Sequence, residues 1–123
     1  NHEFNYGLPF LNQVLGGGMS SRLFQQVREE RGLAYTVFSS PSSYQDTGSL
    51  MLYAGTAPDH LDEVLAVIDG ITADLAADGI TEDEHRVAVG YLVGSMLLGL
   101  EDSGSRMGLL GSGMIVRNEV IPL

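Results

Sequence analysis

The chain has 123 residues, and its 16 acidic and six basic residues give a formal net charge of −10 at pH 7. Nucleic acids and anionic membranes are therefore disfavoured as partners, because an acidic surface repels both. The sequence has no cysteine, which excludes disulfides, a thiol nucleophile and cysteine-bound metal. It contains no apolar run of the roughly 18 residues that suggest a membrane-spanning helix, and its length predicts a single domain over residues 1–123.

The first fifteen residues predict an amphipathic helix that ends at a glycine triplet. Apolar residues recur there every three or four positions, at Phe4, Leu8, Leu11 and Leu15. Pro9 is unfavourable inside a helix, so we expect either a kink or a later start capped by Asn5.

A turn, a short helix and a helix stop are predicted next. The turn is formed by Gly16, Gly17 and Gly18. Glycine permits positive φ and close backbone approach. Ser20 or Ser21 is suited to cap the helix that follows, and Gly32 is suited to end it in the left-handed conformation.

The same glycines permit a second interpretation, a phosphate-binding loop at a helix N-terminus and thus a nucleotide-binding module. The lysine and the spacing of the G-x-x-x-x-G-K-[ST] motif are missing, so the sequence favours a turn or packing role.

Two strands are expected over residues 35–40 and 49–56, because both segments are rich in β-branched and aromatic residues. Pro41 suggests a bulge or an edge position. Both faces of the second strand are apolar, so we expect both to be covered and the sheet to be larger than two strands.

Helices are predicted over most of the remaining chain. Pro58 suits a helix start and Gly79 a stop, with an apolar stripe between them at Leu61, Val64, Leu65, Ile68, Ile71 and Leu75. Thr81 and Glu84 form a capping box. The uncharged run over residues 87–100 predicts a buried helix. The fold class is therefore α+β, with an antiparallel sheet packed by helices.

The other polar candidates favour structural roles. His2, His60 and His85 lack the converging partners that a metal requires, so we predict no metal site in this chain. Glu101 and Asp102 are adjacent acids, but neighbours on a helix point apart. They are expected to end the apolar run rather than to act as an acid–base pair.

Arg28 and Tyr35 are the pair to which we give the most weight. A tight turn at Gly32 would join the helix end that carries Arg28 to the strand start that carries Tyr35. Two donors held close in this way could converge on one carbonyl or carboxylate. The alternative is that Arg28 caps helix carbonyls and Tyr35 fills the strand.

An ordered set of motifs resembles the pitrilysin/insulinase family of zinc peptidases, and most closely its bacterial members similar to mitochondrial processing peptidase. The motifs are LNQVLGGGMSSRLF at 11–24, VREERGLAY at 27–35, SYQDTG at 43–48, YAGT at 53–56, GITEDE at 79–84, LEDS at 100–103 and SRM at 105–107. They cover nearly the whole chain.

The resemblance implies the second, non-zinc domain of such a peptidase, present here as an incomplete fragment. In that family an arginine and a tyrosine with this spacing reach the zinc site of another domain. By resemblance, Arg28 would orient the substrate backbone, and Tyr35 would act in catalysis by hydrogen-bonding the carbonyl oxygen that becomes the oxyanion. The zinc motif H-x-x-E-H is missing here, so this chain alone should be inactive.

The expected partners are therefore a zinc-bearing domain or subunit and a peptide substrate, with a dimer in the full-length protein. The bacterial cytoplasm is the expected compartment, with the periplasm left open. The alternative within the family is a catalytically silent structural subunit, although retention of Arg28 and Tyr35 argues against it.

Overall fold

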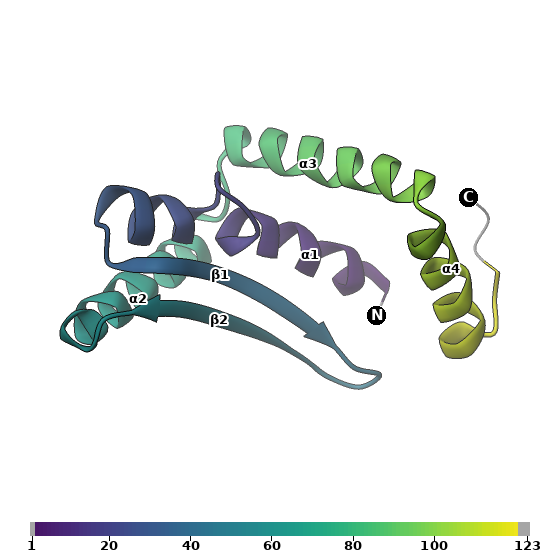
Figure 1. Ribbon diagram of the computed structural model, residues 1–123, viewed down its shortest axis with the longest axis horizontal. Coiled ribbons are helices and arrows are strands. Elements are labelled where there is room, and N and C mark those ends of the chain that lie inside the picture. The colour runs from purple at the N-terminus through teal and green to yellow at the C-terminus, as the bar shows by residue number, and fades with distance from the viewer. Residues whose placement is uncertain (1, 121–123) are drawn as a thin grey trace. The chain divides into compact units, whose positions relative to one another are not determined.

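The computed structural model describes residues 2–120 (Figure 1). The elements in chain order are α1 (His2–Gly16), η1 (Phe24–Glu30), β1 (Ala34–Ser43), β2 (Gly48–Thr56), η2 (Pro58–His60), α2 (Leu61–Asp78), α3 (Glu82–Glu101), α4 (Ser103–Ser112) and η3 (Gly113–Arg117). The chain divides into two compact units, Asn1–Ala88 and Val89–Leu123.

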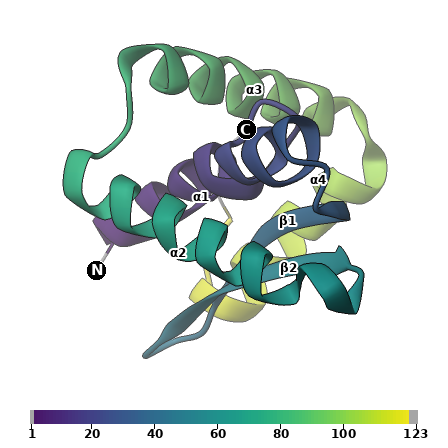
Figure 2. The same cartoon turned by 90° about the vertical axis from the view of Figure 1, so that its left-hand side faces the viewer.

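The first unit is built on an antiparallel hairpin. β1 pairs with β2, and α1 and α2 cover the same face of the pair (Figure 2). The core between these layers includes Leu15 of α1, Val37 of β1 and Val64 and Ile71 of α2. The predicted α+β class, an antiparallel sheet packed by helices, is confirmed.

A β-bulge lies at the start of β1. The register passes from Ala34 opposite Thr56 to Thr36 opposite Gly55, so Tyr35 is the extra residue. Of the two alternatives predicted at Pro41, the bulge is not observed, because Pro41 pairs in register with Leu50, and the edge position is the one that holds. Within the part that the structure describes the sheet has only two strands, so β1 is an edge strand, where a residue without an N–H is tolerated.

The outer face of the hairpin is exposed, contrary to the expectation that both faces are covered. Leu50, Leu52 and Ala54 face the core, whereas Met51 and Tyr53 point outward and are exposed. Successive side chains of a strand point to opposite faces, and apolar residues of β2 lie on both faces, but within the first unit helices cover only one of them.

Helix α1 runs through Pro9 without a late start, so Asn5 lies inside the helix and not at its cap. Pro9 is the eighth of the fifteen residues of α1, so it lies in the helix interior, where its φ is compatible with a helix but its missing N–H removes one backbone hydrogen bond. Helix α2 ends at Gly79, whose φ is +71°. Its buried stripe is narrower than predicted, because Leu61 and Leu65 are exposed.

The prediction of a buried helix over residues 87–100 is wrong for most of the run. The run forms α3 as expected and buries Ala88, but most of its apolar side chains, including Tyr91, Met96 and Leu98, are exposed. Helix formation follows from local sequence, whereas burial requires a facing apolar layer. α3 ends at Glu101, and Asp102 caps α4 by accepting a 2.7 Å hydrogen bond from the Ser105 N–H. Hydrogen bonds from the backbone and side chain of Ser105 lower the pKa of Asp102.

Candidate functional site

The site begins with η1, a π-helical segment whose two ends are fixed by identifiable residues. The helical backbone begins at Arg22, just before η1, and Ser21 is the serine that caps this start, since its Oγ accepts a hydrogen bond from the Phe24 N–H at 3.3 Å. At the other end the Gly32 N–H donates to the Arg28 carbonyl at 3.0 Å, and the Leu33 N–H donates to the Val27 carbonyl at 2.9 Å. The φ of Gly32 is +59°, a conformation that glycine adopts without strain.

Arg28 lies in the last turn of η1 with an exposed side chain. Its guanidinium carbon is 4.9 Å from the centroid of the Phe24 ring, which is a cation–π geometry. Within the described residues its guanidinium forms no hydrogen bond, so its donors remain available to a ligand.

Tyr35 is the bulge residue of β1, and 84% of its surface is exposed. Such exposure is incompatible with a side chain that fills the hairpin. A bulge re-aims a side chain out of the regular alternation. The structure therefore places both members of the predicted pair at the surface, on the two sides of the Gly32 turn, and their joint role stays a prediction.

The glycine triplet works through close packing. Positive φ among the described glycines occurs at Gly32 and Gly79 only, so of the two uses that the sequence permits at the triplet, positive φ and close approach, the structure shows close approach. A Cβ on Gly16 would lie 2.6 Å from the Ser39 nitrogen, and one on Gly17 would lie 2.7 Å from the Gln13 Cα. Because Gly16 has no side chain, the end of α1 can contact β1. Next to this contact, the Ser39 Oγ of β1 donates a hydrogen bond to the Asn12 Oδ1 of α1 at 2.7 Å.

An ion pair that sequence reasoning missed fixes the start of η1. Arg22 donates to both carboxylate oxygens of Glu84 at 2.7 Å and to the Gly79 carbonyl at 2.9 Å. Glu84 also completes the predicted capping box, since its Oε1 accepts from the Thr81 N–H at 2.9 Å. The Arg22 hydrogen bonds hold the pKa of Glu84 down at about 2, and Glu84 raises that of Arg22. The capping-box spacing identified Glu84, but nothing local connects it with Arg22.

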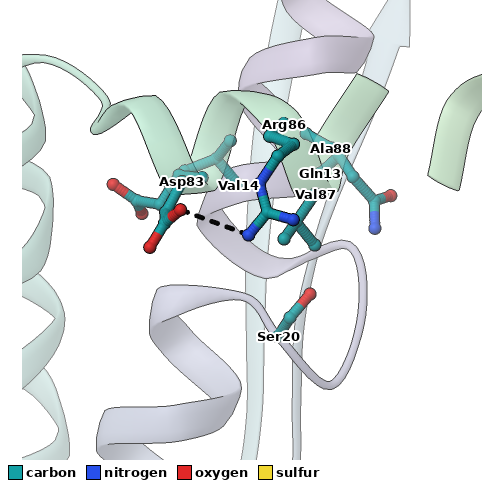
Figure 3. Close-up of a pocket in the computed structure, with 8 residues that line it drawn as sticks. Gln13, Val14, Ser20, Asp83, Arg86, Val87 and Ala88 are labelled. Atoms are coloured by element: carbon teal, nitrogen blue, oxygen red, sulfur yellow. Dashed lines mark hydrogen bonds and ion pairs between the residues drawn. The ribbon is translucent and has the colours of Figure 1, made fainter. Parts of the chain in front are cut away.

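A small pocket of about 240 Å³ lies beside this ion pair (Figure 3). It is lined by Gln13, Val14, Ser20, Asp83, Glu84, Arg86, Val87 and Ala88. The 3.2 Å pair between Asp83 and Arg86 at its mouth is exposed, and such pairs contribute little. Neither Arg28 nor Tyr35 lines this pocket, so it is separate from the predicted pair.

The described side chains do not form a zinc site. Zinc requires three or four converging ligands, and among the described side chains, those of residues 7–120, no three histidines or carboxylates cluster in that way. The side chain of His2 lies outside the described residues. No described helix combines the length and apolarity needed to cross a membrane.

Comparison with known proteins places these features in a family. Residues 1–91 match the family described as the peptidase M16 inactive domain. The chain is 50% identical over 109 residues to an uncharacterized zinc protease of Mycobacterium leprae, covering 89% of this chain and 24% of that protein. It is 48% identical over 106 residues to an uncharacterized zinc protease of Bacillus subtilis, covering 86% and 26%. The chain thus spans about a quarter of the length of these relatives.

Two solved structures are similar. One is the peptidase M16 inactive domain from Pseudomonas fluorescens, with a TM-score of 0.69 and 30% identity over 76% of this chain and 23% of that one. The other is a conserved protein from Enterococcus faecalis, with a TM-score of 0.81 over 97% of this chain and 28% of that one; at 23% identity it supports the fold alone. The predicted resemblance to zinc metallopeptidases is confirmed: the chain belongs to the peptidase M16 family and corresponds to its inactive domain.

Proposed function

We propose that this chain positions a peptide substrate and supplies Arg28 and Tyr35 to a metal site carried by another domain, in the same polypeptide or in a partner. The observation that carries the proposal is the exposure of both side chains on the two sides of one rigid turn at Gly32. The zinc proteases among its relatives support a metal site in the whole protein.

The chemistry of the two side chains suits this role. A phenol O–H donates one hydrogen bond, and a donor fixed in advance stabilises negative charge that develops on a carbonyl oxygen during cleavage. A guanidinium presents several donors in a planar fork, which matches peptide carbonyls or a carboxylate. Stacking on Phe24 holds the Arg28 guanidinium in one place without consuming its donors.

The test is Tyr35→Phe in the full-length parent protein, which removes only the hydroxyl. We expect kcat for peptide cleavage to fall about 10²- to 10³-fold, as for loss of one oxyanion donor, with KM and zinc content nearly unchanged. Tyr44→Phe is the matched control, because Tyr44 is also exposed but lies in the β1–β2 turn.

For Arg28→Ala we expect mainly a higher KM, and for the neighbouring exposed Arg31→Ala little change. Full activity of Tyr35→Phe would remove Tyr35 from the mechanism. A parent that binds zinc but cleaves no peptide would instead support the structural-subunit alternative.

A further inference from the structure

The outer face of the hairpin carries an apolar patch next to Tyr35, which we define as Phe38, Met51 and Tyr53. Their exposed fractions are 38%, 52% and 48%. Phe38 lies opposite Tyr53, and their rings stack with centroids 5.1 Å apart and planes at 25°. Met51 lies two residues along β2 on the same face, so the three side chains form one surface.

The bulge places Tyr35 on this same face. Ala34 and Val37 both point into the core, while Tyr35 and Thr36 between them are both exposed. Because side chains alternate between the two faces of a strand, the residue after Ala34 and the residue before Val37 must both point outward. Tyr35 and Thr36 therefore lie on the same face as Phe38, as is possible at a bulge. A hairpin without the bulge could not present both residues outward and still bury its two neighbours.

Tyr53 extends the patch toward Tyr35. Its hydroxyl lies 3.7 Å from the position that a Cβ on Gly55 would occupy, so its ring leans along β2 over that glycine. Gly55 pairs with Thr36, the residue that follows Tyr35. The surface is thus continuous from the predicted donor to the aromatic pair, and the outward residues between them carry no charge.

We propose that Phe38, Met51 and Tyr53 form a subsite that binds an apolar side chain of the peptide substrate. This inference rests on the proposed role of Tyr35 at the scissile bond. Because Tyr35 is the bulge residue, the segment from Tyr35 to Phe38 spans two to three residues of β2, about 7–10 Å, and an extended peptide covers this distance in two to three residues. The recognised side chain therefore lies about two to three residues from the scissile bond, and aromatic rings provide its contact area.

The experiment uses the full-length parent and pairs of peptides that differ by leucine or serine at one position, scanned about two to four residues on each side of the cut. The selectivity is the ratio of kcat/KM for the leucine peptide to that for the serine peptide. We expect Tyr53→Ser to lower it about five- to tenfold at one position and Met51→Ser about two- to threefold, because the contact is open rather than enclosed. Leu65→Ser is the control, since Leu65 is 53% exposed but lies on α2.

Unchanged selectivity at every scanned position would overturn the subsite. So would an equal loss for both peptides, which would indicate that another part of the parent or a second copy covers the patch. An equal effect of Leu65→Ser would also overturn it, because the effect would then not be specific to the patch. Circular-dichroism melting of each variant checks that folding is retained.

A second measurement separates this inference from the proposed function. The dissociation constants of the same peptide pairs, measured with cleavage blocked by a chelator, should show the same loss of preference in Tyr53→Ser. If Tyr35→Phe leaves turnover intact while Tyr53→Ser lowers the preference, the subsite stands and the role of Tyr35 fails. If Tyr35→Phe abolishes turnover while no preference changes, the subsite fails and the role of Tyr35 stands.

Discussion

Residues 2–88 and residues 89–120 both form helices from apolar-rich sequence, but only the first region buries that sequence. Among the described side chains, every buried apolar residue lies between Val14 and Ala88. In the second region large apolar residues such as Met96, Met107 and Ile115 are exposed. The comparison shows that periodicity and caps are sufficient to specify a helix, whereas its burial depends on the layer that faces it.

The largest expected effect comes from truncating one leucine in each region. Leu23 is fully buried in the core, so Leu23→Ala should destabilise the first unit by about 2–5 kcal/mol through lost contacts and a cavity. Leu98 is 71% exposed, and Leu98→Ala should change the free energy of unfolding by less than about 0.5 kcal/mol. Hydrogen–deuterium exchange with peptide-level resolution reports each region separately. Similar destabilisation by both variants would mean that Leu98 is covered in solution.

A pair of glycine substitutions sharpens the comparison. Gly16→Ala should destabilise by about 1–3 kcal/mol, because its Cβ would meet the backbone of Ser39 at 2.6 Å. Gly94→Ala in α3 should stabilise by about 0.5–1 kcal/mol, because nothing lies within 4 Å of its Cβ and alanine favours a helix. Urea unfolding followed at 222 nm measures both. A destabilising Gly94→Ala would show that α3 packs closely against another surface.

The smallest expected effect is the pH dependence of the Arg22–Glu84 pair, which lies wholly in the first region. Since the pKa of Glu84 falls from 4.5 to about 2 on folding, its stabilisation is complete above pH 4.5 and is lost as the pH falls toward 2. Glu84→Gln should therefore cost about 1–2 kcal/mol at pH 7 and progressively less at lower pH.

Urea midpoints of both proteins between pH 7 and pH 2 provide the measurement for this pair. Asp83→Asn is the control, because its partner Arg86 is exposed and such pairs contribute little. A constant difference between wild type and Glu84→Gln across this range would contradict the assigned pKa.

In the candidate site, as in the fold, features with local causes could be predicted from the sequence, and features that depend on distant contacts could not. Gly32, the capping serine and the Thr81–Glu84 box have local causes, so their residue types and spacing indicated their geometry in advance. The bulge at Tyr35 could not be predicted in this way, because it depends on the register of a strand about twenty residues later. The Arg22–Glu84 pair joins residues 62 positions apart, and no local pattern indicates such a contact.

The sequence by itself determined the helices, the helix-end signals at Ser21, Gly32, Gly79 and the Thr81–Glu84 box, the hairpin and the family resemblance, because each depends on short-range backbone preferences or on an ordered set of motifs. Tertiary structure alone decided which apolar faces are buried, where the strand register shifts and which charges pair. Those features depend on contacts between distant segments, whose free energy no single segment contains.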